Sequence, residues 1–142
     1  MIRHAPLLEI GAGTGFWARL LHDRGADLIA SDPRIERLHF EHARYAVPGR
    51  WWDLQGKTAV RRWPERNIFC SWPSLNKTWL RQAAKAMRPG RVLLCVVEDA
   101  TADERTWDYI EAGPFEKIAS LELIGWHSCH DRLVAWKKRG TR

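Results

Sequence analysis

The residues with the clearest chemical meaning lie between Leu7 and Gly15, a segment that reads Leu-Leu-Glu-Ile-Gly-Ala-Gly-Thr-Gly. Apolar residues flank an acidic residue, and glycines then follow at alternate positions, a pattern typical of a buried strand that turns sharply into a helix. A Cβ at any of these glycines would occupy the space beside the turn, so we expect a ligand to lie against bare backbone there. The N–H groups at the start of the following helix would point into the same space.

The spacing of the glycines distinguishes two classes of ligand. Dinucleotide sites favour G-x-G-x-x-G, with the third glycine three positions after the second. Here the third glycine comes two positions after the second, and Glu9 precedes the turn. The pattern acidic-x-G-x-G-x-G resembles the first motif of the class I S-adenosylmethionine-dependent methyltransferases. This resemblance implies that the turn approaches the methionine part of the cofactor and that Glu9 helps to orient it. A nicotinamide or flavin site and a purely structural turn are the alternatives.

A second acidic residue follows the next apolar run. Residues Asp27–Ser31 predict a strand, which Asp32-Pro33 ends. In Rossmann-like folds a carboxylate about 20 residues beyond the glycines accepts hydrogen bonds from the ribose hydroxyls, and Asp32 lies at that distance. With the glycine turn in place, we favour this role over a simple turn or helix cap. The residues expected to bind the cofactor are Glu9, Gly11, Ala12, Gly13, Thr14, Gly15, Asp32, Pro33 and Asp53.

The predicted fourth strand ends in Ser71-Trp72-Pro73-Ser74. The segment resembles in part the [Asp/Asn/Ser]-Pro-Pro-aromatic motif of amino-methylating nucleic-acid enzymes. In those enzymes a polar side chain and a carbonyl hold an exocyclic amine, and an aromatic ring stacks on an extruded base. Here Trp replaces the first proline and Ser the final aromatic residue. We therefore expect Ser71, Trp72 and Pro73 to form a substrate wall, with nucleic-acid methylation and a purely structural strand end as alternatives.

Titratable side chains gather in the segment from Trp126 to Asp131. His127 and His130 are candidates for a general base or for groups that shape the substrate pocket. Solvated loop histidines are the alternative. Cys129 adds a third potential metal ligand, but no second ligand pair at zinc spacing occurs elsewhere in the sequence, so we expect no metal site.

The order of apolar runs and helix-like segments predicts an α/β fold with a mainly parallel sheet covered by helices. Strands are expected at 6–10, 27–31, 50–54, 67–71, 91–97, 116–124 and 131–136, and helices at 16–24, 35–44, 77–87 and 101–112. A capping box formed by Thr101 and Glu104 is expected to begin the last helix. Since the carboxyl ends of parallel strands meet at one edge, the motifs above should lie together there.

This order resembles the Rossmann-like methyltransferase fold over residues 6–138, a mostly parallel seven-stranded sheet with a C-terminal antiparallel hairpin. Within that superfamily the chain looks most like a group of small methyltransferase-like proteins. Phe16-Trp17, Trp72-Pro73 and Asp131-Arg132-Leu133 match motifs of that group. Other members carry a helical segment before the first strand, and we expect this chain to lack that N-terminal cap helix. An open cofactor face would suit a homodimer or a partner chain, so a non-catalytic accessory subunit is an alternative to an enzyme.

Length and composition set the remaining expectations. A chain of 142 residues is long enough for one core, so we expect a single domain over 1–142. No apolar run approaches the roughly 20 residues that cross a bilayer, which argues against a membrane partner. The odd number of cysteines and the absence of a signal-peptide core predict free thiols in the cytoplasm. The net charge of +6 gives weak support for nucleic acid, because the basic residues are scattered. The predicted function is methyl transfer from S-adenosyl-L-methionine to an unidentified acceptor.

Overall fold

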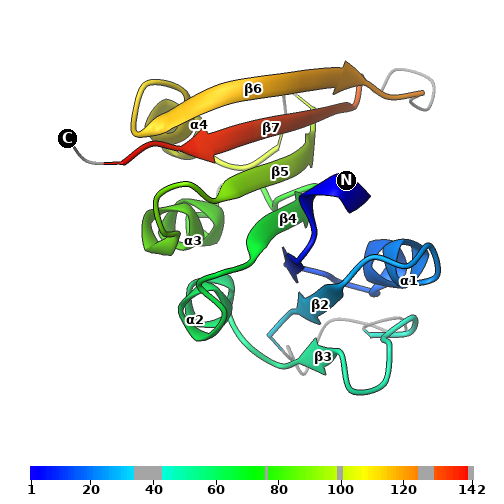
Figure 1. The fold of residues 1–142 in the computed structure, drawn as a ribbon. Helices are drawn as coiled ribbons and strands as arrows, with labels where there is room; N and C mark the ends of the chain where they lie inside the picture. Colours follow the sequence, from blue (N-terminus) through cyan, green and yellow to red (C-terminus); the bar gives the residue numbers. More distant parts are fainter. Residues whose placement is uncertain (34–42, 76, 99–100, 125–129, 141–142) are drawn as a thin grey trace.

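The computed structural model describes residues 1–33, 43–75, 77–98, 101–124 and 130–140, which hold one seven-stranded sheet flanked by helices (Figure 1). The strands are β1 (Leu7–Ile10), β2 (Leu28–Ser31), β3 (Trp51–Trp52), β4 (Asn67–Ser71), β5 (Val92–Val97), β6 (Phe115–Glu122) and β7 (Arg132–Lys138). The helices are the short 3₁₀ turn η1 (Ile2–His4), α1 (Phe16–His22), α2 (Gly56–Arg62), α3 (Trp79–Ala86) and α4 (Glu104–Glu111). None of the described helices is long and apolar enough to span a membrane.

The strands follow the order β3-β2-β1-β4-β5-β7-β6 across the sheet. Strands β1 to β5 pair in parallel, whereas β7 runs antiparallel to both β5 and β6. The predicted mostly parallel sheet with a C-terminal antiparallel hairpin is therefore confirmed. The continuous apolar run of β5 is buried along its whole length, as expected for a strand covered on both faces.

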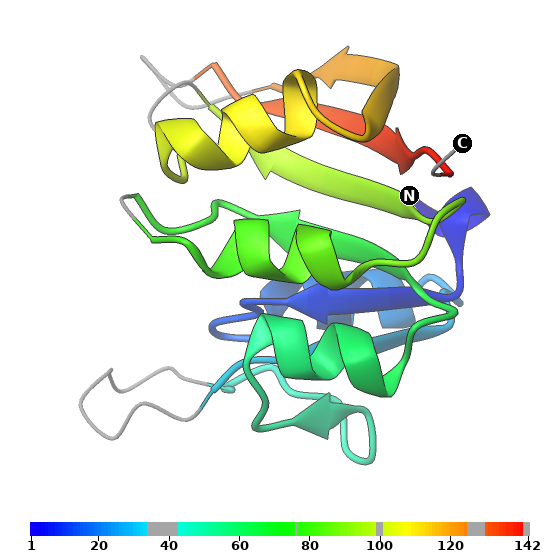
Figure 2. The same ribbon diagram turned by 90° about the vertical axis from the view of Figure 1, so that its left-hand side faces the viewer.

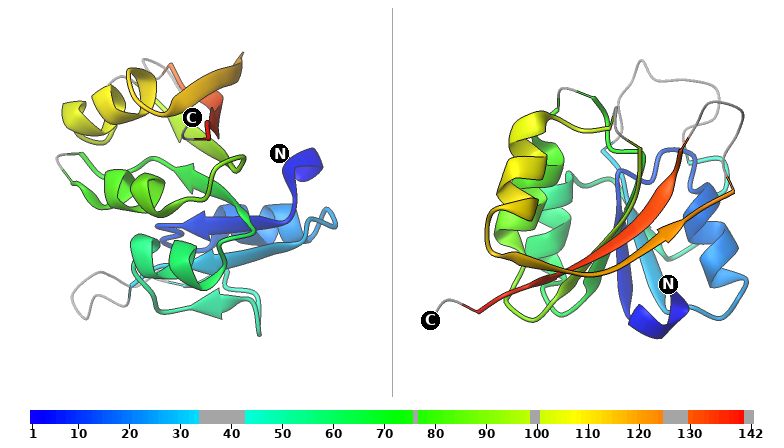
Figure 3. Two further views of the ribbon diagram at one scale, coloured as in Figure 1. Left: turned by 60° about the vertical axis from the view of Figure 1, so that its left-hand side comes forward. Right: turned by 90° about the horizontal axis from the view of Figure 1, so that it is seen from above.

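Two apolar layers hold the helices to the sheet, because successive residues of a strand point to opposite faces. On one face, Leu8 of β1 belongs to a buried cluster with Ala59 of α2, Leu80 of α3 and Ile110 of α4. On the other face, the cluster contains Leu21 of α1 together with residues of β1, β2 and β4. Figures 2 and 3 show α2, α3 and α4 side by side on one face, with α1 across the sheet from them.

The amino ends of the parallel strands are tied together by polar contacts. The Arg66 guanidinium binds both oxygens of the Asp27 carboxylate at 3.2 Å and donates to the Leu7 carbonyl at 3.1 Å. Asn67 donates to the His4 carbonyl and accepts from the Val92 N–H, both at 2.8 Å. These contacts join β1, β2, β4 and β5 at one edge of the sheet.

The same edge carries a buried lysine. The Lys138 ammonium, at the end of β7, donates to the carbonyls of Ala84, Lys85 and Met87 at 2.8 to 2.9 Å. A cation is favourable at a helix C-terminus, where the last carbonyls have no partner within the helix. Lys138 therefore fixes the end of α3 beside the start of β5.

The structure differs from the sequence-based expectation at the starts of two helices, α2 and α4. No helix was expected after Gln55, yet α2 begins at Gly56. Glycine has poor helix propensity, so the sequence gives no signal for a helix start at this position. The N-cap of α4 is Asp103 and not Thr101: the Asp103 carboxylate accepts from the Thr106 N–H at 3.0 Å, whereas the Thr101 hydroxyl donates to the Glu98 carbonyl. The helix predicted at 35–44 lies almost wholly outside the described residues.

Candidate active site

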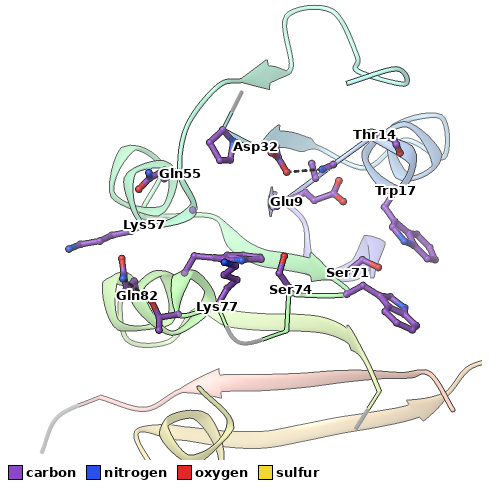
Figure 4. Close-up of a pocket in the computed structure, with 18 of the residues that line it drawn as sticks. Glu9, Thr14, Trp17, Asp32, Gln55, Lys57, Ser71, Ser74, Lys77 and Gln82 are labelled. Atoms are coloured by element: carbon purple, nitrogen blue, oxygen red, sulfur yellow. Dashed lines mark hydrogen bonds between the residues drawn. The ribbon is translucent and has the colours of Figure 1, made fainter. Parts of the chain in front are cut away.

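A cavity of about 1220 Å³ lies beyond the carboxyl ends of β1, β2 and β4 (Figure 4). The strand order reverses between β1 and β4, which is where open α/β sheets bind their ligands. The lining residues are Glu9, Gly11, Ala12, Gly13, Thr14, Phe16, Trp17, Asp32, Pro33, Gln55, Gly56, Lys57, Ser71, Trp72, Ser74, Lys77, Thr78, Trp79 and Gln82. The cavity thus gathers both predicted cofactor motifs and most of the predicted substrate wall.

The glycine turn and the second acidic residue form one unit. The Gly13 N–H donates to Asp32 Oδ2 at 2.8 Å, across nineteen residues of sequence. Gly13 has φ +54, in the left-handed region that favours glycine, and a Cβ there would meet no atom within 4 Å. Gly13 therefore presents bare backbone to the open part of the cavity.

The other two glycines of the turn face the protein's own atoms, which corrects the expectation that each leaves space for a ligand. A Cβ at Gly11 would lie 2.7 Å from Cη2 of Trp79. A Cβ at Gly15 would lie 3.1 Å from the Ala46 nitrogen and 3.2 Å from the Trp51 ring. Gly11 therefore makes room for an indole and Gly15 for the segment before β3, since a side chain at either position would collide with packed atoms.

Trp79 is a lining residue that sequence reasoning missed. It is the first residue of α3 and is half-buried, with its ring against Gly11. No local pattern indicates this contact, because it depends on how α3 is placed relative to a turn that lies far away in the sequence. The indole closes one side of the cavity beside the glycine turn.

Glu9 is the most unusual titratable group of the cavity. Its side chain is 1% exposed, and its Oε2 has no hydrogen-bond partner. Burial raises the pKa of the Glu9 carboxyl to about 8, although a hydrogen bond from the Ala18 backbone opposes this shift and the nearby charge of Asp32 adds to it. A carboxyl that is buried without a counter-charge keeps its proton at neutral pH. The group is therefore poised to ionise when a cation comes close.

The predicted substrate wall is only partly exposed to the cavity. Ser71 and Trp72 line it, whereas Pro73 is buried and does not. Trp72 has φ +51, and non-glycine residues rarely adopt this left-handed conformation, least of all bulky ones. Such a conformation costs roughly 1–3 kcal/mol and persists only where the surroundings enforce it.

The starts of α2 and α3 contribute polar residues that the sequence did not single out. Figure 4 shows Gln55 and Lys57 on the α2 side and Lys77 and Gln82 on the α3 side of the cavity. The sequence shows no helix start at Gln55, so Gln55 and Lys57 could not be placed near the glycine turn. Together with Ser74 they give this side of the cavity a polar lining.

Other predicted site residues lie elsewhere. Asp53 is exposed and lies outside the cavity lining, and its Oδ1 accepts from the Trp51 indole N–H at 3.2 Å. His130 is exposed and does not line the cavity. His127 and Cys129 lie outside the described residues.

Comparisons with known proteins were informative at the level of structure. Neither the protein-family models nor the curated proteins gave a match to this chain. A SAM-dependent methyltransferase from Anabaena variabilis has a similar structure, with a TM-score of 0.66 and 10% identity over 94% of this chain and 77% of that one. The N-methyltransferase NodS from Bradyrhizobium japonicum is similar with a TM-score of 0.59 and 13% identity, over 94% of this chain and 85% of NodS. The antibiotic-resistance methyltransferase Kmr is similar with a TM-score of 0.57 and 16% identity, over 96% of this chain and 87% of Kmr.

These likenesses fall below 25% identity and establish the fold. The chain has the Rossmann-like fold of the class I S-adenosylmethionine-dependent methyltransferases, as the glycine motif and the order of elements predicted.

Proposed function

We propose that this chain, which has the class I methyltransferase fold, is a single domain over residues 1–142 that binds S-adenosylmethionine and transfers its methyl group to an acceptor. The observation that carries the proposal is the buried carboxyl of Glu9, whose Oε2 lacks a partner beside a turn where Gly13 faces open space. An unpartnered buried polar atom next to a cavity of this size is costly unless a ligand satisfies it.

The chemistry of Glu9 fits the cationic end of the cofactor. S-adenosylmethionine carries a sulfonium and an ammonium, and a nearby positive charge favours the ionised form of a carboxyl. In the free protein the proton remains on Glu9, because burial places its pKa at about 8. Binding of a cationic group would release that proton and supply the missing partner for Oε2.

Asp32 and Gly13 fit the nucleoside part. The hydrogen bond from the Gly13 N–H holds the Asp32 carboxylate at the lining of the cavity, beside the open face of the turn. A carboxylate at the end of the second strand suits ribose hydroxyls, which are hydrogen-bond donors. Pro33, Ala12 and Thr14 also line the cavity and complete the proposed cofactor site. Gly11 would act through its contact with Trp79, and the proposal places no ligand contact on Gly15 or Asp53.

The acceptor would lie on the side of Ser71 and Trp72. The sulfonium supplies an already activated methyl group, so the protein has to align an acceptor with it and accept a proton where the acceptor carries one. Figure 4 shows Ser71 at the end of β4 and Ser74 in the segment that follows, on the same cavity as Glu9 of β1 and Thr14 of the glycine turn. Their hydroxyls can hold a polar group of the acceptor.

Titration calorimetry with S-adenosylhomocysteine at pH 7, in phosphate and in Tris, tests the cofactor proposal. We expect wild-type protein to release close to one proton on binding, because Glu9 gives up its proton to pair with the ligand ammonium. Glu9→Gln should bind at least tenfold more weakly and release none. The exposed Glu104 provides the matched control Glu104→Gln, which should behave as wild type. The absence of heat at millimolar ligand, or proton release that persists in Glu9→Gln, would contradict the proposal.

A second candidate is an accessory subunit that binds the cofactor without transferring a methyl group. The exposure of the site favours it: Phe16 and Trp72 are 51% and 48% exposed, and α1 is the one α-helix on its face of the sheet among the described residues. A homodimer or a partner chain would cover these rings. Light scattering after size exclusion, with and without S-adenosylhomocysteine, measures the mass, and labelled-methyl incorporation into DNA, RNA and small amines measures activity. A monomer that methylates any of them excludes this candidate.

The cytoplasmic location is part of the same proposal. Cys70 and Cys95 are Cα partners on the neighbouring strands β4 and β5, yet both are free and fully buried. Burial raises the pKa of the Cys70 thiol, which keeps it protonated and unreactive. Two adjacent reduced thiols are expected in a reducing compartment.

A further inference from the structure

Trp72 is a large, half-exposed ring at the cavity, and the described residues give it no aromatic partner. Its side chain is 48% exposed and lines the cavity, and no other described ring lies against it. Most tryptophans of this chain differ in this respect: Trp52 packs on Trp63, and Trp107 stacks on Trp136. An aromatic face left open at a cavity is available to a ligand.

The backbone at Trp72 is held in a conformation that tryptophan rarely adopts. Trp72 has φ +51 and precedes Pro73, and a residue before proline is normally confined to extended backbone. Hydrogen bonds hold the backbone before and after this residue pair. The Trp72 N–H donates to the Val96 carbonyl at 2.9 Å, and the Pro73 carbonyl accepts from the Ala102 N–H at 2.9 Å. Glycine would adopt this conformation without strain. A strained tryptophan at a cavity points to a role for its ring.

A second aromatic side chain lines the cavity at the start of α1, the helix that follows the neighbouring strand β1. Phe16 follows the glycine turn after β1, is 51% exposed and lines the same cavity. Its ring packs edge-on against Trp17 at 5.8 Å and Tyr45 at 6.0 Å, which fixes its orientation. Because β1 and β4 are adjacent, the start of α1 with Phe16 and the loop with Trp72 border the same cavity.

We propose that the methyl acceptor is a planar aromatic or heteroaromatic ring that stacks on Trp72, with Phe16 at the other side of the opening and the Ser71 and Ser74 hydroxyls holding its polar substituent. This rests on the proposed methyl transfer and gives the acceptor a chemical class. An N–H nitrogen of the ring, or an amino or hydroxyl group attached to it, would form the new bond to the methyl carbon as the bond to sulfur breaks. S-adenosylhomocysteine leaves, and the proton of the acceptor passes to solvent.

The test uses 6-aminoquinoline and its fully saturated counterpart, decahydroquinolin-6-amine, titrated into the protein and followed by ligand-detected NMR. Each titration is run with and without saturating S-adenosylhomocysteine. The variants are Trp72→Leu, which removes the ring, and Trp72→Phe, which restores a smaller one. Leu75→Ala is the matched control, because Leu75 lies in the same loop, is 57% exposed and does not line the cavity. A single-stranded dA dodecamer provides a ring from nucleic acid.

We expect 6-aminoquinoline to bind at least tenfold more tightly than the saturated amine, and Trp72→Leu to lose about tenfold of that affinity. Trp72→Phe should retain most of it and Leu75→Ala all of it, while the affinity for S-adenosylhomocysteine stays within twofold in every variant. If the dA dodecamer binds more tightly than 6-aminoquinoline and Trp72→Leu weakens this binding, the result supports the proposal and identifies the ring as a nucleobase.

Equal affinity for the two amines, no binding of 6-aminoquinoline at millimolar concentration, or unchanged binding in Trp72→Leu would overturn the proposal, even where S-adenosylhomocysteine binds. Conversely, ring binding that depends on Trp72 in a protein without affinity for S-adenosylhomocysteine would keep the aromatic site and remove the proposed methyl transfer. The two proposals therefore fail separately.

Discussion

The two ends of the parallel strands are built differently. At the amino ends, Arg66 pairs with Asp27, Asn67 bridges His4 and Val92, and the Lys138 ammonium satisfies three carbonyls. At the carboxyl ends, oxygens of Glu9, Glu98 and Asp131 are buried without partners, and Trp72 adopts strained backbone. Among the described residues, the amino ends leave two buried nitrogens without a partner, Arg66 Nε and Trp136 Nε1, whereas the carboxyl ends combine unpartnered carboxyl oxygens with backbone strain.

This difference shows how the sheet separates stability from ligand binding. Polar contacts that join strands stabilise the fold, so a protein can retain costly features at the other end of the same strands. Substitutions at the amino ends should therefore change stability and leave ligand affinity alone. Substitutions at the carboxyl ends should change ligand affinity, and at Glu9 and Trp72 they should maintain or increase stability.

The largest effect is expected from Glu9 in the ligand-free protein. Its carboxyl pKa is about 8 in the folded state, against an ordinary value of 4.5. Between these pH values the folded state keeps a proton that the unfolded state gives up. The free energy of unfolding should therefore fall as pH rises from about 4.5 to about 8, by roughly 4 kcal/mol, and change little from this group above 8.

Urea unfolding at pH 5 and pH 8 measures this dependence. Glu9→Gln should lose the decline and be more stable than wild type at pH 8, and the exposed Glu104→Gln should keep it. Parallel pH profiles for wild type and Glu9→Gln would show that Glu9 is already ionised in the free protein.

The next effect concerns the amino ends. Arg66→Met removes a two-oxygen ion pair and a hydrogen bond to the Leu7 carbonyl, and the Arg66 side chain is only 14% exposed. We expect a loss of about 2–3 kcal/mol in the free energy of unfolding, with the affinity for S-adenosylhomocysteine unchanged. Arg61→Met, an exposed change on α2, is the control for urea unfolding and calorimetry. If Arg66→Met also lowered the affinity for S-adenosylhomocysteine, the amino ends would contribute to ligand binding as well as to stability, and the comparison would be wrong.

A matched pair of glycines sharpens the comparison. Gly13 and Gly90 both have positive φ and open space around a Cβ, but Gly90 lies in the turn before β5 at the opposite edge. Alanine at either position should cost about 1–2 kcal/mol of stability through backbone strain. Gly13→Ala should in addition weaken S-adenosylhomocysteine binding at least tenfold, because its Cβ enters the cavity. Equal affinities of the two variants would argue against a ligand at the turn.

The smallest effect is expected at Trp72. Trp72→Gly relieves the left-handed strain, which offsets the loss of a half-exposed ring, so thermal unfolding should occur at or slightly above the wild-type temperature. Leu75→Gly, in the same loop but without positive φ, should unfold at a slightly lower temperature than wild type. A clearly lower unfolding temperature of Trp72→Gly would mean that the indole contributes to stability.

Much of the architecture was predictable from local patterns. The apolar run of β5 and the strand 67–71 were placed within one residue of their observed ends, because continuous apolar residues between turn signals have few other solutions. The start of α2 was not predicted, because Gly56 and a length of seven residues give little helix signal. The N-cap of α4 was misplaced because Thr101 and Asp103 both satisfy capping preferences and only packing distinguishes them.

For the site, the sequence alone determined which residue types would meet at the carboxyl edge: the alternating glycines, Glu9, Asp32 and the segment after β4. Chain order and the shared direction of parallel strands are sufficient for that. Tertiary structure decided what each of them faces. It placed Trp79 on Gly11, left Gly13 open, buried the Glu9 carboxyl without a counter-charge and forced Trp72 into left-handed backbone. Such features arise from contacts between residues far apart in the chain, and no local spacing encodes them.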